Sequence, residues 1–440
     1  MKKKDYPHIA VPPPGPRARE IMARHDRYAS TSYPKEYPLV VASGRGAMVE
    51  DVDGNRYLDF MAGIAVAATG HAHPGVVAAV QEAAGRFLHI CGSDFYYSTF
   101  SGVCEALARL MPGPGEKRVF LTNSGTEAVE AAIKLARNST RRPGLVAFTG
   151  SFHGRTYGAM SLTASKARQR EGHGPFVPEV YHAPYPTPYR CDVCSGSDCT
   201  RHCLATLEEL FARRLAPRDT AAIFVEPIQG EGGYVVPTRG FLAGLRALCD
   251  RHGMLLVMDE VQSGIGRTGR MFACEHEDVA PDVLVTAKGL ASGLPLGAVI
   301  ARADVMKWEP GAHGSTFGGN PVCCAAALAT LDLVENGLLQ NAAAMGERLL
   351  SGLRGLAEKH GAIGDVRGRG LLIGLELVED RRTRALAPHR VRALVDRAFE
   401  RGLLLLGCGP SAVRVAPPLV VDEEDVDTGL HILDECLGAP

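Results

Sequence analysis

The sequence predicts an α/β protein with a large domain, built on a mostly parallel sheet covered by helices, and a smaller α+β domain. From about residue 75, short apolar runs rich in β-branched residues alternate with helical patterns, which is typical of a parallel sheet buried on both faces. The chain has 440 residues, 46% of them hydrophobic, which is enough for two packed domains. A long Ala- and Leu-rich helix is expected over 322–335, and a different α+β pattern follows it.

The expected elements follow in chain order. Residues 1 to about 38 are rich in proline and charge, so they are expected to lie over a surface. Asp53-Gly54-Asn55 lies between apolar runs within residues 46–60, which predicts a hairpin turn. The apolar runs predict strands at Val119–Thr122, Leu145–Phe148, Ala222–Val225, Leu255–Met258, Val283–Val285, Ala298–Ile300, Leu371–Glu376 and Val413–Val415.

These elements predict three parts. An N-terminal segment over residues 1–74 joins the small domain, a large domain covers 75–330, and a small C-terminal domain covers 331–440. The hinge between the two domains is expected within residues 325–340, near the end of the long helix.

The overall charge excludes some classes of partner. The net charge is −1, so there is no basic excess of the kind that nucleic-acid binding requires. No stretch approaches 18 uncharged apolar residues, so no membrane span is expected. Lys2, Lys3 and Lys4 are followed by no apolar core, so no signal peptide is expected. A cytoplasmic enzyme is the expectation.

A phosphate-binding turn is a candidate at Asn123–Glu127, between an expected strand and an Ala-rich helix. Ser124, Gly125 and Thr126 would offer hydroxyl groups and backbone N–H groups at a helix N-terminus, where the helix dipole favours an anion. An ordinary helix cap by Ser124 or Thr126 is the alternative, and alone the motif favours that alternative.

Two residues that follow buried strands are candidates for catalysis. Asp259 ends the run that begins at Leu255, where a carboxylate could keep a pyridine nitrogen protonated. Lys288 follows Val283–Val285, and a partly desolvated lysine can form a Schiff base. The alternatives for Asp259 are a salt-bridged or helix-capping residue and a metal-binding or phosphoryl-transfer acid, and the alternative for Lys288 is a surface lysine. A Gly-rich turn at 314–321 could add donors to a phosphate or could be only a flexible loop.

Taken together and in order, these segments resemble the class III (ornithine/4-aminobutyrate type) aminotransferases of pyridoxal-5′-phosphate (PLP) fold type I. The resemblance covers about residues 38 to 430. The segments that carry it are Ala62–Val66 with Gly70-His71, Asn123–Glu127, Phe152–Thr156, Glu226–Gly233, Met258–Gly264 with Gly266–Gly269, Lys288–Leu290 and Thr316–Pro321.

The resemblance implies how PLP would be held. Lys288 would bind it as a Schiff base and later move the proton, and Asp259 would pair with the pyridine nitrogen. Gln262 would bind the phenolic oxygen, with Phe152 on one face of the ring and Val261 on the other. The phosphate would be bound by Gly125 and Thr126, with Ser124 a less certain contributor, and by Thr316 of the neighbouring subunit. A homodimer with shared sites follows, which could pair further into a tetramer.

The resemblance also implies a substrate site. Arg155 would bind a substrate carboxylate, and Glu231 would mask Arg414 until the α-carboxylate of glutamate or 2-oxoglutarate arrives. A plain structural salt bridge is the alternative for Glu231. Ile64 lies where ornithine-preferring relatives tend to carry a tyrosine, which points to a 4-aminobutyrate-like or other ω-amino acid.

A cysteine-rich insert at residues 188–203 departs from the common pattern of that family. Cys191, Cys194, Cys199 and Cys203 have a C-x2-C-x4-C-x3-C spacing that could hold a structural metal, with His202 as a spare ligand. Two disulfides or free thiols are the alternatives. Similar inserts occur in archaeal-type relatives, some of which are amino-acid racemases.

Three functions therefore remain open on the sequence. The first is transfer of the amino group of a 4-aminobutyrate-like ω-amino acid, or of ornithine or lysine, to 2-oxoglutarate, which gives glutamate and a semialdehyde. The second is racemisation or epimerisation of an amino acid on the same scaffold. The third, a non-catalytic protein of PLP fold, is disfavoured because Lys288, Asp259, Gln262 and Arg155 occur together.

Overall fold

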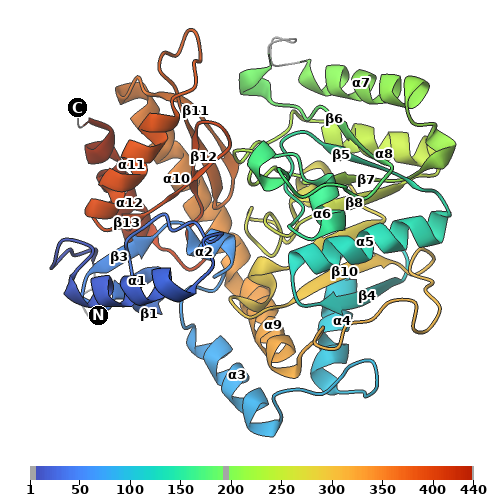
Figure 1. Ribbon diagram of the computed structural model, residues 1–440, viewed down its shortest axis with the longest axis horizontal. Helices are drawn as coiled ribbons and strands as arrows, with labels where there is room; N and C mark the ends of the chain where they lie inside the picture. The colour runs from blue at the N-terminus through green and yellow to red at the C-terminus, as the bar shows by residue number, and fades with distance from the viewer. Residues whose placement is uncertain (1–5, 192–197, 439–440) are drawn as a thin grey trace.

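The computed structural model describes residues 6–191 and 198–438 and contains three sheets (Figure 1). The central sheet has seven strands in the order β4-β10-β9-β8-β7-β5-β6. The strands β9, β8, β7, β5 and β6 are parallel, while β10 is antiparallel to both of its neighbours. The predicted mostly parallel sheet is confirmed. Its strands are β4 (Lys117–Thr122), β5 (Gly144–Phe148), β6 (Val180–Ala183), β7 (Thr220–Val225), β8 (Leu255–Asp259), β9 (Val283–Thr286) and β10 (Gly297–Arg302).

Both faces of this sheet are covered, so successive residues of each strand enter different apolar layers. Leu145, Phe224 and Val257 belong to the layer under α5 (Gly125–Thr140), and the neighbouring residues of the same strands belong to the main core on the other face. That face is covered by α8 (Phe241–His252), with α4 (Ser98–Leu110) against β4. The remaining helices of this half are α3 (Pro74–Arg86), α6 (Tyr157–Leu162) and α7 (Cys199–Arg213).

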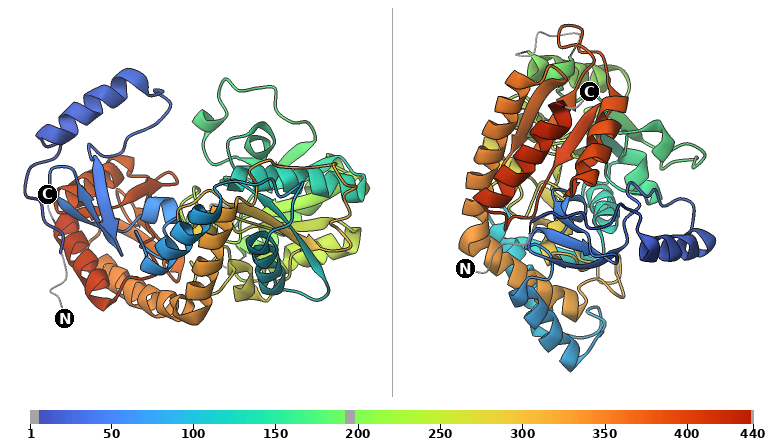
Figure 2. Two further views of the ribbon diagram at one scale, coloured as in Figure 1. Left: turned by 90° about the horizontal axis from the view of Figure 1, so that it is seen from below. Right: turned by 90° about the vertical axis from the view of Figure 1, so that its left-hand side faces the viewer.

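The smaller half combines both ends of the chain. The strands β2 (Met48–Asp51) and β3 (Arg56–Asp59) form the predicted hairpin, and β13 (Leu403–Leu404) pairs in parallel with β3. The N-terminal segment therefore shares a sheet with C-terminal residues. The other elements here are α1 (Pro16–Tyr28), β1 (Val41–Arg45), α2 (Ala62–Ala65), α10 (Leu339–Lys359), β11 (Ile363–Arg369), β12 (Leu372–Leu377), α11 (Pro388–Glu400), β14 (Leu406–Cys408), β15 (Ala412–Val415) and α12 (Glu423–Gly438). Figure 2 shows α1 projecting from the body of this half.

A long helical connection joins the two halves. Helix α9 (Pro321–Leu333) continues through a π-helical turn at Val334–Leu338 into α10. By length and composition alone, the span Pro321–Lys359 is apolar enough to cross a membrane. Its first part packs against α3, α4 and the turn that begins at Lys288, so the apolar side chains of α9 contribute to the core. The domain boundaries given above stay a prediction.

Two glycines of α10 test how closely this helix packs against the turn at Gly370. A Cβ atom at Gly346 would lie 2.4 Å from the carbonyl of Gly370, whereas one at Gly355 would meet nothing within 4 Å. We expect Gly346→Ala to destabilise the protein by about 1–3 kcal/mol, because the helix must move away from backbone atoms. Gly355→Ala is the matched control and should stabilise it by about 0.5–1 kcal/mol through helix propensity. Urea unfolding of both variants measures this, and equal signs would contradict the packing.

Candidate active site

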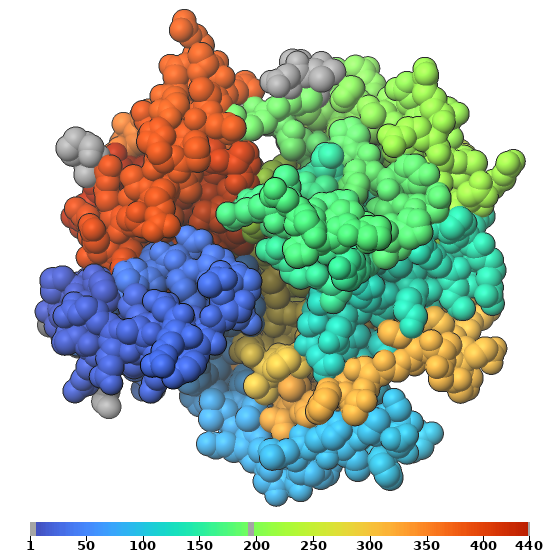
Figure 3. All heavy atoms as spheres, viewed as in Figure 1, coloured from blue at the N-terminus to red at the C-terminus, as the bar shows by residue number. Residues whose placement is uncertain are grey.

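Two adjoining cavities lie between the halves of the molecule, where Figure 3 shows a hollow between the N-terminal segment and the large domain. The first has a volume of about 440 Å³ and is bordered by residues that follow strands of the central sheet. The second, of about 740 Å³, is bordered by the N-terminal segment and by residues near β14 and β15. Both cavities reach Phe152, Arg155, Gln262 and Lys288, so these residues stand where the two spaces meet.

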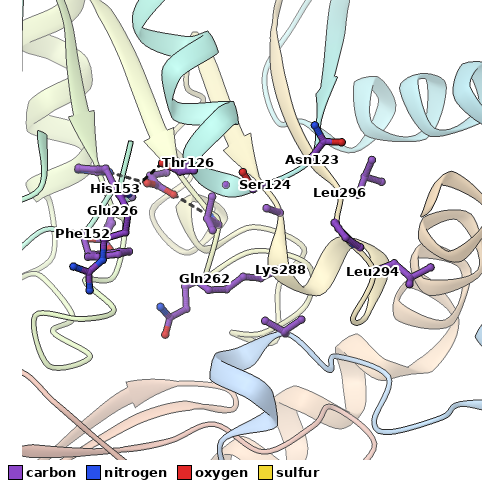
Figure 4. Close-up of a pocket in the computed structure, with 18 of the residues that line it drawn as sticks. Asn123, Ser124, Thr126, Phe152, His153, Glu226, Gln262, Lys288, Leu294 and Leu296 are labelled. Carbon is purple, nitrogen blue, oxygen red and sulfur yellow. Dashed lines mark hydrogen bonds and ion pairs between the residues drawn. The ribbon is translucent and has the colours of Figure 1, made fainter. Parts of the chain in front are cut away.

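Lys288 lies two residues beyond the end of β9 and points into the first cavity, between Gln262 and Leu294 in Figure 4. Lys288 is the first residue of a short 3-10 turn and has a backbone φ of +36°. Burial lowers the pKa of the Lys288 ammonium, and this effect outweighs the nearby carboxylates of Asp259 and Glu226, which raise that pKa. The neutral amine that a Schiff base requires is therefore more populated at Lys288 than in a solvated lysine.

Asp259, the last residue of β8, is 4% exposed and is held by hydrogen bonds on both oxygens. Its Oδ2 atom lies 2.7 Å from Nδ1 of His153, and its Oδ1 atom accepts a hydrogen bond from the backbone N–H of Val261. Burial lowers the pKa of His153, but the hydrogen bond and the charge of Asp259 raise it more, so the net shift is upward. Asp259 thus faces the cavity as an oriented carboxylate. Sequence reasoning included His153 in a motif but missed this contact.

The turn Asn123–Thr126 lies at the N-terminus of α5 and borders the first cavity. Ser124 caps the helix, because its Oγ accepts the backbone N–H of Glu127 at 3.3 Å. A Cβ atom at Gly125 would lie 2.7 Å from Val261, so only glycine fits there. The Thr126 hydroxyl oxygen accepts the backbone N–H groups of Arg155 and Thr156. Ser124 therefore caps helix α5 and also borders the first cavity.

The side-chain amide of Gln262 has a buried oxygen with no hydrogen-bond partner among the described residues. Its Oε1 atom is buried without a hydrogen bond, and so is Nε2 of His153. Since buried amide groups are costly to leave unpaired, Gln262 is placed for a polar group that enters the cavity. Phe152 and Val261 border the same cavity. The residues present therefore fit PLP: a lysine amine, an acid, an amide, an aromatic ring and a helix N-terminus surround one space.

Glu226 is a buried carboxyl that sequence reasoning quoted in a motif without giving it a role. It follows β7, and its two oxygens accept the backbone N–H groups of Phe152 (2.9 Å) and Gly230 (3.0 Å). Burial raises the pKa of Glu226 to about 7, with the charge of Asp259 adding to the rise and His153 opposing it. The carboxyl orders two loops of the cavity. Its signal in the sequence is its place directly after a buried strand.

The second cavity contains a set of paired charges. Glu231 accepts hydrogen bonds from Nη2 of Arg414 at 2.6 Å and from Nζ of Lys166 at 2.5 Å. Burial would raise the pKa of Glu231, but the Arg414 guanidinium and the Lys166 ammonium lower it below its usual value. The predicted contact between Glu231 and Arg414 is present, whereas Lys166 was missed, because a lysine in the polar stretch Ser165–Arg168 carries no signal of burial.

Arg155 and Ile64 border the same second cavity. The guanidinium of Arg155 lies 5.5 Å from the ring centroid of Phe152. The ion pairs of Glu231 in this cavity are with Lys166 and Arg414. An arginine beside the cavity with an aromatic ring on one side is suited to a carboxylate ligand. Ile64 is 39% exposed and offers that ligand only apolar contact.

Two groups of predicted site residues lie elsewhere. Thr316 is exposed and borders neither cavity of its own chain, so a role for it at a phosphate requires a second subunit. In the insert, Cys199 and Cys203 are buried one turn apart in α7, and Cys191 is half-buried. Cys194 lies outside the described residues, so the predicted metal site stays a prediction.

The sequence is similar to those of known aminotransferases. The family model "Aminotransferase class-III" matches residues 29–437. The 4-aminobutyrate aminotransferase of Mycobacterium leprae is 42% identical over 97% of this chain and 96% of its own length. The 5-aminovalerate aminotransferase DavT of Pseudomonas aeruginosa is 42% identical over 91% and 93%. An alanine/serine racemase of Pyrococcus horikoshii is 40% identical over 98% and 93%.

The fold is similar to those of solved structures. The taurine:2-oxoglutarate aminotransferase of Bifidobacterium kashiwanohense, in complex with PLP and glutamate, superposes with a TM-score of 0.90 and 29% identity over 96% of this chain and 97% of that one. The likeness therefore extends through both halves of the molecule and includes a structure that holds the predicted cofactor.

Proposed function

Because the chain belongs to the class III aminotransferases, we propose that it is a PLP-dependent enzyme that moves the terminal amino group of an ω-amino acid such as 4-aminobutyrate or 5-aminovalerate to 2-oxoglutarate. The observation that supports this most directly is the second cavity, in which Arg155 offers a cation for one carboxylate and Glu231 covers a second cation, Arg414. A donor with a single distal carboxylate and an acceptor with two carboxylates both find matching charges there.

PLP, when bound, supplies an electron sink for the bond that breaks at the amine-bearing carbon. The residues of this chain hold and move protons around it. Asp259 would keep a proton on the pyridine nitrogen, and its contact with His153 fixes the orientation of its carboxylate. The Gln262 amide would face the phenolic oxygen, and Phe152 and Val261 would confine the ring. The N–H groups at the start of α5 would bind the phosphate.

Lys288 carries the proton transfer. With PLP bound, the Nζ atom of Lys288 would be the base that takes the proton from the carbon bearing the substrate amino group and the acid that returns it to the cofactor. The lowered pKa of the buried Lys288 favours the neutral form that this step requires. Leu294 and Leu296 border the cavity beside Lys288 and limit the entry of water (Figure 4).

Selection between the two substrates follows from the charges in the second cavity. While an ω-amino acid is bound through Arg155, Glu231 neutralises Arg414, so no buried cation is left unpaired. When glutamate or 2-oxoglutarate arrives, its α-carboxylate takes the place of the Glu231 carboxylate at Arg414. Ile64 offers no hydrogen bond to an α-carboxylate, which favours donors without one.

We also infer a homodimer in the cytoplasm. Thr316 is exposed on its own chain and is followed by the exposed Phe317. Phe317 contacts His89 with ring centroids 5.0 Å apart, and His89 follows the exposed Leu88. A second copy would cover these exposed apolar side chains and could receive Thr316 at its phosphate.

A donor screen tests the proposed function. The purified holoenzyme is incubated with 2-oxoglutarate and 4-aminobutyrate, 5-aminovalerate, ornithine, lysine or taurine, and glutamate formation is measured. We expect the ω-amino acids to be the best donors. A parallel assay follows the optical rotation of alanine and serine without a 2-oxo acid. Inversion without glutamate formation would assign a racemase and overturn the proposal.

Glu231→Gln is expected to separate the two half-reactions. The amide keeps the size of Glu231 but leaves Arg414 without a countercharge, so the carboxylate of an ω-amino acid is drawn to Arg414 instead of Arg155. We expect kcat/KM for 4-aminobutyrate to fall by about 10- to 100-fold, as for loss of one buried charge contact, while the value for glutamate changes little. Glu358→Gln, on the exposed face of α10, is the control. An equal loss for both donors would contradict the role of Glu231.

A further inference from the structure

The loop that carries Glu231 is closed at its base by two backbone hydrogen bonds between Gln229 and Val235. The Glu226 carboxylate holds the N–H of Gly230, but Glu231 itself lies between two glycines. The loop sequence is Gln229-Gly230-Glu231-Gly232-Gly233, and Gly233 has a φ of +122°, in the region that favours glycine. Glycines on both sides of Glu231 give this backbone more freedom than any other residue would. A carboxylate that must alternate between partners needs a fixed starting position, and further contacts from outside the loop help to supply it.

Those contacts come from the small domain. The backbone N–H of Gly409 donates to the carbonyl oxygen of Glu231 at 2.8 Å. Two nitrogens of Arg367, Nε and Nη2, donate to the carbonyl oxygen of Gly233 at 3.1 and 2.6 Å. The approach is close, because a Cβ atom at Gly374 would lie 2.9 Å from that same oxygen.

Arg367 is itself rigidly held. Its Nη1 atom pairs with Asp365 at 2.9 Å and its Nη2 atom with Glu376 at 2.6 Å, and its side chain is 14% exposed. Glu376 is 2% exposed and gives its other oxygen to Nε of Arg190 at 2.6 Å. Three elements therefore meet behind the loop, namely β11, β12 and the start of the cysteine-rich insert, which contains Arg190.

Arg367 does not face the substrate. It borders neither of the two cavities of the active site, and it lines a separate cavity of about 470 Å³ together with Gly232. The direct contact of Arg367 with the Glu231 loop is to the backbone carbonyl of Gly233, so its side chain can act on that loop without touching the substrate. A guanidinium suits this task because its planar set of donors can bind a carbonyl and two carboxylates at once.

We infer that Arg367 is a positioning residue for donor selectivity: from the small domain it holds the Glu231 loop so that Glu231 covers Arg414 when an ω-amino acid is bound. This inference rests on the proposed function. Without Arg367, the loop departs from this position and Arg414 is covered less well. The ω-amino donor then loses rate, whereas glutamate, which displaces Glu231 in any case, does not.

Arg367→Met tests this in the holoenzyme, because methionine keeps much of the length without the donors. We expect kcat/KM for 4-aminobutyrate to fall about fivefold to tenfold and that for glutamate to change less than about twofold, so the ratio of the two shifts. Arg367→Lys keeps the charge facing Asp365 and Glu376 and should therefore fold even if the methionine variant does not; it should shift the ratio in the same direction by less. Arg348→Met, which removes an ion pair with Asp427 on the same domain, is the matched control and should leave the ratio unchanged.

The results distinguish failure of the role of Arg367 from failure of the proposed activity with ω-amino donors. If wild-type enzyme uses no ω-amino donor, the proposed function fails. If wild-type enzyme uses one, but the folded Arg367 variants lower both donors equally or leave the ratio unchanged, Arg367 has only a structural role and the inference is overturned. Thermal unfolding of each variant shows whether a uniform loss comes from stability.

Discussion

Lys288→Ala is expected to reduce glutamate formation by more than about 10³-fold, the largest effect of any single change in this protein. The variant loses both the amine that joins the cofactor and the group that moves the proton, each of which contributes a large factor. Turnover in the coupled assay with 4-aminobutyrate and 2-oxoglutarate measures this. Thermal unfolding should show a folded protein, because removing the buried amine also removes the cost of its desolvation.

The control is Lys359→Ala, which removes an exposed lysine whose ammonium contacts Asp434. It should leave turnover unchanged. A small primary amine such as methylamine should restore part of the activity of Lys288→Ala, because the truncation leaves space at the cavity for it. Activity above a tenth of wild type without added amine would show that Lys288 is not the essential amine.

Asp259→Asn is expected to give the second largest loss, about 10²- to 10³-fold in kcat, comparable to removal of one preorganised electrostatic group. Asparagine keeps the size and one acceptor facing His153 but cannot hold a proton on the pyridine nitrogen as an ion pair. The loss should appear in kcat more than in KM, because substrate carboxylates are bound elsewhere. Steady-state kinetics with both substrates separate the two parameters.

Asp282→Asn provides the matched comparison. Asp282 is also a buried carboxylate of the central sheet, but it pairs with Arg246 and Arg302 and borders neither cavity of the active site. Its replacement should lower the unfolding temperature and leave kcat close to wild type. If Asp259→Asn behaved in the same way, with a loss of stability and a normal kcat, Asp259 would be a structural residue.

The sequence predicted the strands that form the middle of the sheet because burial on both faces leaves unbroken apolar runs, as in Leu255–Met258. The edge strand β6 was missed. Its sequence, Val180–Ala183, contains a tyrosine and a histidine and is half-buried, so it has no such run. The antiparallel direction of β10 was also out of reach, because composition indicates burial but not direction.

The candidate site also contains some residues that the sequence predicts and others that it does not. Lys288 and Asp259 were predictable because each follows a buried strand, and strand ends meet at one edge of a sheet. Lys166 and Arg367 were not, since their positions depend on contacts with Glu231 and Gly233, which lie far away in the sequence. No local pattern encodes a pairing between residues that lie more than 60 positions apart.

The antiparallel strand β10 determines when the active site can form during folding. Strand β4, which leads into the turn at Ser124, is attached to the described sheet through β10, about 180 residues later in the chain. Closing such a long loop is slow. The pairing of β3 with β13 is more distant still and joins Leu58 to Leu403. A growing chain on the ribosome therefore reaches β10 before β4 can join the sheet and position the turn at Ser124, and reaches Leu403 before β13 can pair with β3.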